Sequence, residues 1–129
     1  MNKILVEVSV GELLDKISIL EIKKEKIKDK DKLMFINDEY NILNDQLKKN
    51  IKIDDKLNQL FKSLKEINAK LWLIEDEKRM YEKNSDFGEK FIKVSRDIHF
   101  FNDDRAKIKL EINNHTGSKI KEIKEYTSY

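Results

Sequence analysis

Apolar residues along most of this chain recur at steps of three and four, which is the spacing of one face of an α-helix. The clearest stripe lies in the middle of the sequence and consists of Leu57, Leu60, Leu64, Ile67, Leu71 and Ile74. A β-strand would instead place an apolar residue at every second position. The pattern therefore predicts a long helix that follows Asp54, a candidate N-cap, and ends near Lys83.

The same rhythm predicts two helices before this one. Ser9 and Glu12 form an S-x-x-E capping box, so the first helix is expected to begin there. Besides its main stripe, this helix has a second and weaker apolar side that carries Ile19 and Ile22. The second helix is predicted from about Lys32 to Lys49. No charged residue lies at the centre of its stripe, which is typical of a structural helix.

A fourth helix is predicted from Phe87 to about Asn114. Asp86 and Glu89 can cap its start, and Gly117 is an end signal after it. Because the third and fourth helices are long and keep the same rhythm, they should pack at a shallow crossing angle. The fold class is therefore all-α: an antiparallel bundle of about four helices, with two long C-terminal helices, in a single domain over residues 1–129.

Short extended segments are expected at both ends of this bundle. Residues 3–8 (KILVEV) are mostly apolar and β-branched, which favours an extended arm. The only partner for such an arm within the chain would be the tail, residues 121–126. A lone two-stranded pair is marginal unless it packs on helices.

Composition narrows the class of protein further. Hydrophobic residues make up 39% of the 129 residues and charged residues 40%, so much of every helix must face water. The sequence has no cysteine, which excludes disulfides, thiolate zinc sites and a cysteine nucleophile. The N-terminal apolar run is too short for a signal peptide, and no stretch approaches the roughly 20 apolar residues of a membrane span. These features predict a cytoplasmic protein with no membrane contact.

Charge and surface pattern bear on possible partners. The formal net charge of +2 is too small to indicate nucleic acid, and the lysines of residues 23–32 alternate with acids. We therefore expect no nucleic-acid partner. Some apolar residues lie off the main stripes and favour a homodimer; they are Ile19, Ile22, Leu73 and Phe100.

Polar residues interrupt the apolar stripes of three predicted helices. They are Glu21 and Lys24 in the first, Glu75 and Lys78 in the third, and Asn102, Arg105 and Lys109 in the fourth. A buried charge without a partner is costly, so such groups normally pair. The signs match, and the planar guanidinium of Arg105 suits carboxylates such as those of Glu21 and Glu75.

Two interpretations of these inward charges compete. They form either a buried network that fixes helix register or the lining of a cleft between helices, where bundle proteins commonly hold ligands. In a cleft, arginines would attract a carboxylate or phosphate, and an acid would orient it. The candidate ligand-binding residues are Glu21, Glu75, Arg79, Arg96, His99, Asn102, Asp103, Arg105 and Lys109.

Signatures of catalysis are mostly missing from the sequence. His99 and His115 lack metal-ligand spacing, and there is no nucleophile elbow, P-loop or dinucleotide-binding motif. Four acids could in principle converge on a magnesium ion: Glu21, Glu75, Asp76 and Asp103. Their cationic neighbours favour solvated faces instead. We therefore predict no metal, no cofactor and a non-enzymatic protein-interaction module. The alternative is binding or transformation of a small anionic ligand around Arg105.

Four segments of the chain resemble a family of small uncharacterised proteins of bacteria and phages, a domain of unknown function. The segments are VSVGELLDKISILEIKKEKI (8–27), LWLIEDEKR (71–79), FNDDRAKIKLEIN (101–113) and GSKIKEIKEY (117–126). This resemblance implies an all-helical fold and supplies no activity. The matching segments hold most of the candidate ligand-binding residues, which favours the cleft interpretation slightly.

Overall fold

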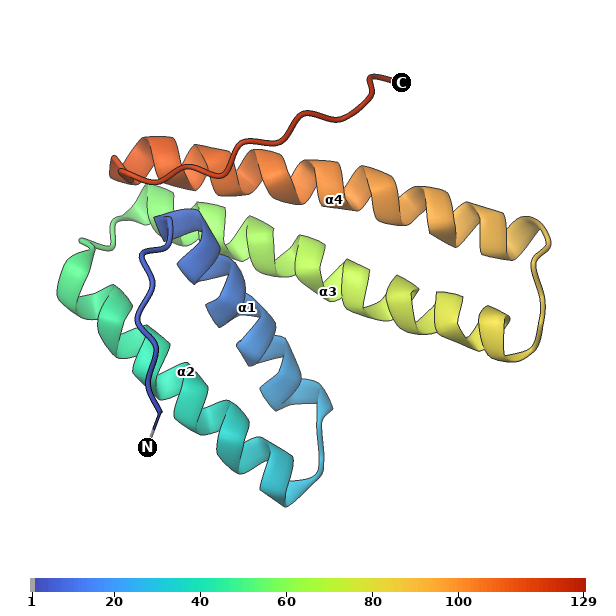
Figure 1. Cartoon of the computed structure of the whole chain (residues 1–129), viewed down its shortest axis with the longest axis horizontal. Helices are drawn as coiled ribbons and strands as arrows, with labels where there is room; N and C mark the ends of the chain where they lie inside the picture. The colour runs from blue at the N-terminus through green and yellow to red at the C-terminus, as the bar shows by residue number, and fades with distance from the viewer. Residues whose placement is uncertain (1) are drawn as a thin grey trace.

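The computed structural model describes residues 2–129, which form four α-helices joined by short loops (Figure 1). The helices are α1 (Val10–Lys26), α2 (Lys30–Asn50), α3 (Asp55–Lys83) and α4 (Glu89–Thr116). No residue from 2 to 129 lies in a β-strand. The predicted all-α class, with α3 and α4 the longest helices, is confirmed.

The helices are arranged as two antiparallel hairpins, α1–α2 and α3–α4, which meet at one end and diverge towards the other (Figure 1). α1 is the central helix because it packs against each of the other three. The main core lies where the hairpins meet and consists of Leu14, Ile17, Leu47, Leu57, Leu60, Leu64 and Ile112. The far half of the α3–α4 hairpin extends beyond α1, and Figure 1 shows it without a covering helix.

The predicted start signals hold for two helices. The Ser9 hydroxyl accepts a hydrogen bond from the Glu12 N–H at 3.0 Å, and Asp54 accepts one from the Leu57 N–H at 2.8 Å. The start of α2 differs slightly: Asp29 caps it by accepting from the Lys32 N–H at 3.0 Å, so the helix begins two residues earlier than expected.

The predicted cap of α4 is wrong. The helix begins at Glu89 after Gly88, and no side chain caps it. Asp86 instead accepts a hydrogen bond from the Gly88 N–H at 3.2 Å, and its own N–H donates to the Tyr81 carbonyl at 2.8 Å. Asp86 therefore belongs to the turn that ends α3. Gly117 does end α4, in the left-handed conformation with φ 67°.

The start of α1 is docked directly onto the end of α4. A β-carbon on Gly11 would lie 2.6 Å from the Lys109 carbonyl oxygen, so only glycine fits at this approach. The Gly11 N–H donates to the Asn113 side chain at 2.7 Å, and the Val10 N–H donates to the Ser118 hydroxyl at 3.2 Å. Residues near the C-terminus thus satisfy N–H groups that the first turn of a helix leaves free.

The two chain ends do not pair with each other, so the predicted arm–tail pair is wrong. The N-terminal arm runs back past α1 and α2, whereas the C-terminal tail follows α4 (Figure 1). The tail is held there by Glu122, which accepts from Lys109 at 2.9 Å, and by edge-to-face contact of Tyr129 with Phe100. Within residues 2–129, no helix is both long and apolar enough to cross a membrane.

Candidate functional site

A cluster of polar side chains lies between α1, α3 and α4, with the Asp15 carboxylate at its centre. Asp15 is only 2% exposed. Arg105 of α4 donates to both carboxylate oxygens, through Nε at 3.0 Å and through Nη2. Asn68 of α3 donates to Oδ1 of Asp15 at 2.9 Å and to the Ser18 hydroxyl at 2.8 Å. We call Asp15, Ser18, Asn68, Arg105 and Lys109 the Asp15 network.

Lys109 extends this network towards the tail. Its Nζ lies 2.7 Å from Glu12, 2.9 Å from Glu122 and 3.9 Å from Asp15. The residue is buried, yet its ammonium has three carboxylates around it. Every buried side-chain nitrogen and oxygen within residues 2–129 has a hydrogen-bond partner, so the network is fully satisfied.

The electrostatics of the network favour the charged forms. Burial alone would raise the pKa of Asp15, but the hydrogen bonds from Arg105 and Asn68 and the charges of Arg105 and Lys109 outweigh it, and the pKa is lowered. Burial likewise opposes the charge of Lys109, whose pKa is nevertheless raised by Glu12 and Glu122. The Asp15 network is therefore a paired set of ions that ties three helices together.

Sequence reasoning found the guanidinium of this network but assigned it the wrong acids. Glu21 and Glu75 were expected to receive Arg105, and Asp15 receives it instead. The main apolar stripe of α1 begins at Val10. Asp15 follows Val10 by five residues and therefore lies about 140° around the helix from that stripe, at roughly 100° per residue. That face carries Gly11, Ser18 and Ile22, all of which are buried in the structure. Asn68 was also missed, although it lies four residues after Leu64 and within the main stripe of α3.

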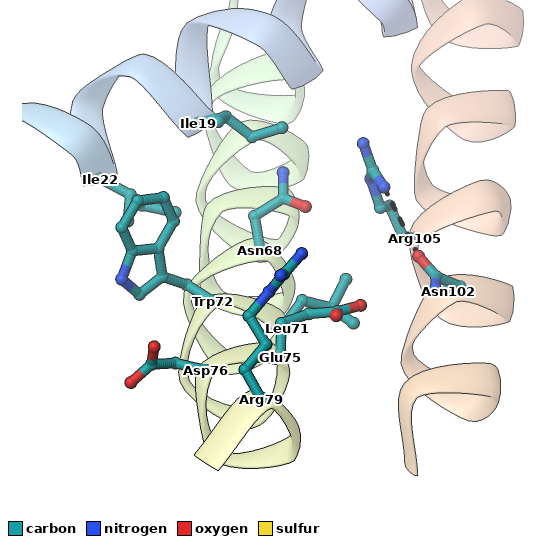
Figure 2. A pocket seen from close by; sticks show the side chains of 10 residues that line it. All are labelled: Ile19, Ile22, Asn68, Leu71, Trp72, Glu75, Asp76, Arg79, Asn102 and Arg105. Atoms are coloured by element: carbon teal, nitrogen blue, oxygen red, sulfur yellow. Dashed lines mark hydrogen bonds between the residues drawn. The ribbon is translucent and has the colours of Figure 1, made fainter. Parts of the chain in front are cut away.

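Next to the network, a pocket opens between α1, α3 and α4 where the hairpins diverge. Its volume is about 380 Å³. Its lining consists of Ile19, Ile22, Asn68, Leu71, Trp72, Glu75, Asp76, Arg79, Asn102 and Arg105. In Figure 2, Trp72 and Asp76 extend from α3 towards the α1 side, whereas Glu75 extends towards α4. The pocket thus combines an apolar floor with several charged groups.

The charged groups of the pocket differ in how they are paired. Arg105 directs two of its nitrogens to Asp15 and a third to Asn102, at 3.5 Å. Within residues 2–129, no ion pair or side-chain hydrogen bond involves Glu75, Asp76 or Arg79. These three side chains are also exposed. The pocket therefore offers two carboxylates and one guanidinium to a ligand.

Four of the nine predicted ligand-binding residues line this pocket: Glu75, Arg79, Asn102 and Arg105. Lys109 belongs to the Asp15 network and does not line the pocket. The structure thus brings the predicted cluster together only in part.

The other four lie elsewhere. Glu21 accepts from Lys65 at 3.1 Å and from the Tyr40 hydroxyl at 3.3 Å. Asp103 accepts from the hydroxyl of Tyr129 in the tail. Arg96 and His99 are exposed and do not line the pocket. Arg96, His99 and Asp103 lie on sides of α4 that face solvent or the tail. Glu21 lies on α1 and faces α2 and α3 instead.

A second feature that stands apart from the helices is the N-terminal arm, residues 3–8. Ile4, Leu5 and Val6 are 87%, 81% and 73% exposed. Among the hydrogen bonds within residues 2–129, none involves a residue from 2 to 8. The arm therefore exposes both its apolar side chains and its backbone N–H and C=O groups.

The chain belongs to a family of proteins whose function is not established. The family model that matches it is described as a family of unknown function, DUF6165, and the match covers residues 4–129. No curated protein and no solved structure matches the chain. The match to the family confirms the predicted resemblance to a domain of unknown function.

The residues from 2 to 129 contain no cluster of three or more His, Asp or Glu side chains able to hold a metal ion.

Proposed function

We propose that this protein is a non-enzymatic interaction module whose helical bundle presents the N-terminal arm to a partner protein. The exposure of Ile4, Leu5 and Val6 on an extended and unpaired backbone carries this proposal. Consecutive apolar residues that face water are costly, and contiguous exposed apolar surface is typical of interaction sites.

The chemistry of the arm favours pairing with the edge of a β-sheet. In an extended segment, Ile4, Val6 and Val8 lie on one face and Leu5 and Glu7 on the other. Strand addition uses backbone hydrogen bonds for affinity and alternate side chains for specificity. A second copy of this chain would supply only another arm or a tail, and a two-stranded pair is marginal. The arm therefore fits a partner that already has a sheet of two or more strands.

Site-specific photo-crosslinking in cells tests this proposal. A photoreactive phenylalanine replaces Leu5 in the arm, and the matched control places it at Lys52, an exposed residue of the loop between α2 and α3. We expect a discrete crosslinked species from position 5, which disappears when Val6→Asp is added. Equal crosslinking from both positions, or none from position 5, would refute the proposal.

A homodimer is a separate proposal with less support. Of the residues that suggested it, Ile22 is buried within the chain, and Phe100 contacts Tyr129 of the tail. Leu73 remains 60% exposed, and Met80, two turns further along the same face of α3, is 48% exposed. Light scattering at micromolar concentration tests it: a dimer mass that Leu73→Asp reduces to one chain supports the proposal, and a single-chain mass for the wild type excludes it.

A function in binding small anions around Arg105 has less support still. The guanidinium of Arg105 is already neutralised by Asp15, and Glu75 and Asp76 add negative charge to the adjacent pocket. A purely anionic ligand would have to approach these carboxylates. The charge balance favours a ligand that also carries a cationic group.

A further inference from the structure

The pocket beside Trp72 has the size and lining of a small-molecule site. Its volume of about 380 Å³ falls within the roughly 300–1,000 Å³ that is usual for ligand pockets. Ile19 and Ile22 of α1 face Leu71 and Trp72 of α3 across it. These apolar groups can accept an aliphatic chain or the face of a flat group.

The charges of the pocket restrict what such a ligand can be. Glu75 and Asp76 carry two negative charges, and Arg79 carries one positive charge. Arg79 lies four residues after Glu75 and three after Asp76, which are helical spacings at which pairs form, but such exposed pairs add only about 0.2–0.5 kcal/mol. One guanidinium can neutralise only one of the two acids. These three groups together leave one negative charge in the pocket, which favours a ligand with a cationic group.

Trp72 adds a further preference for a cation. An ammonium or guanidinium group close to an indole face is attracted by the negative potential of the ring, and tryptophan is the best aromatic residue for this contact. In Figure 2, Trp72 and Asp76 extend to the same side of α3. A cation bound by Asp76 would thus lie close to the indole.

We propose that this pocket binds a basic residue that has a free carboxylate: an aliphatic stem with a cationic head at one end and a carboxylate at the other. The head lies at Asp76 beside Trp72, the stem packs on Trp72 and Leu71, and the carboxylate pairs with Arg79. Glu75, on the α4 side of α3 (Figure 2), adds negative potential to the pocket. Free lysine or arginine and a peptide that ends in either residue share this chemistry.

The chain itself offers a direct readout, because Trp72 is its only tryptophan and lines the pocket. The test titrates the full chain with L-lysine, L-arginine and the tripeptide Gly-Gly-Lys, and follows Trp72 fluorescence and calorimetric heat. We expect saturable binding with a Kd of about 1 mM or tighter, because the charged groups are exposed and each contributes modestly. Binding of the free amino acids identifies a metabolite as the source, and binding of the tripeptide alone identifies a peptide terminus; both support the proposal.

Analogues that lack one group test the separate contacts. Nε-acetyl-L-lysine has lost the cationic head, and cadaverine has lost the carboxylate. Each should bind about tenfold more weakly than L-lysine, which is the factor that corresponds to one charge-assisted hydrogen bond. Inorganic phosphate should not bind. Equal binding of Nε-acetyl-L-lysine, stronger binding of phosphate, or no saturable change with any basic probe would overturn the proposal.

Variants test whether the fluorescence and calorimetric signals come from binding in the pocket or elsewhere on the surface. Glu75→Gln combined with Asp76→Asn should weaken L-lysine binding about tenfold or more, and Arg79→Met should weaken binding of L-lysine but not of cadaverine. Glu66→Gln on the exposed side of α3 is the matched control and should bind as the wild type does. Since all four positions are exposed, circular dichroism should show an unchanged fold. Binding that survives the double variant would overturn the proposal.

Discussion

The α3–α4 hairpin has two halves with similar helical patterns and different surroundings. In the half near Leu64, α1 lies across the hairpin, and the ions there are buried or half-buried and paired around Asp15. In the half beyond Trp72, no helix of residues 2–129 covers the hairpin, and Glu75, Asp76 and Arg79 are exposed. The stripe residues Arg105 and Glu75 therefore have different outcomes in one molecule: Arg105 joins a structural network where a third helix supplies its partner, and Glu75 lies in an open site where none does.

The comparison is tested most strongly by Asp15→Ala. This change leaves Arg105 and Asn68 without their common acceptor and removes a carboxylate 3.9 Å from the Lys109 ammonium. Removing one partner of a buried ion pair typically costs about 3–5 kcal/mol. Urea unfolding followed by circular dichroism measures the loss. Asp76→Ala, in the uncovered half, is the matched control and should change the free energy of unfolding by less than about 0.5 kcal/mol. Similar losses for both variants would abolish the distinction between the halves.

The pH dependence of stability sharpens the same contrast. The pKa of Asp15 is lower in the folded state than its unfolded value of about 3.9, so its ionised form stabilises the fold above that pH. The contribution is lost as pH falls through the lower folded pKa. We expect the difference in free energy of unfolding between the wild type and Asp15→Asn to be full near pH 6 and to shrink below about pH 4. A difference that stays constant from pH 6 to pH 3 would show that the carboxylate charge is unimportant.

The close approach of α1 to α4 predicts a smaller effect for Gly11→Ala. The added methyl group would meet the Lys109 carbonyl oxygen at 2.6 Å and force the helices apart, at a cost of about 1–3 kcal/mol. Gly88→Ala, at the exposed start of α4, meets only Asp86 at 3.3 Å and should cost less. Thermal unfolding of both variants measures the difference. If Gly88→Ala lowered the melting temperature more, the docking of α1 would not be the sensitive contact.

The smallest effect is expected in the arm, which lies outside both halves of the hairpin. Leu5→Asp should change the free energy of unfolding by less than about 0.5 kcal/mol, because Leu5 is 81% exposed. Chemical denaturation of the purified chain provides the measurement. A loss above about 1 kcal/mol would mean that the arm packs on the bundle in solution, against the interaction proposal.

The sequence allowed the helices to be predicted more fully than their contacts. The apolar stripes and the caps at Ser9 and Asp54 are local features, and they predicted the starts of α1 and α3 to within one residue of the structure. The same periodicity identified Arg105 as an inward-facing ion. It could not identify Asp15 as the partner, because α1 is buried on two sides and the face that carries Asp15 combines the small residues Gly11 and Ser18 with a single large apolar residue, Ile22.

The pocket was harder to predict for a related reason. Spacing along a helix shows which residues share a face, but it does not show where a neighbouring helix ends. Glu75 and Asn68 lie on the same face of α3, separated by two turns; Asn68 is buried against α1, and Glu75 is exposed. Where α1 diverges from α3 depends on its length and on its docking to α4. Both are properties of the assembled fold.

The capping of α1 by Asn113 and Ser118 has a consequence for the order in which the protein assembles. These hydrogen bonds join residues 102 and 108 positions apart. During synthesis at about 5–20 residues per second, the first helix is made several seconds before the groups that complete its first turn. Truncation of the chain after Ile112 would remove Asn113 and Ser118 and leave α3 intact in sequence. The Val10 and Gly11 N–H groups of α1 would then lose their acceptors.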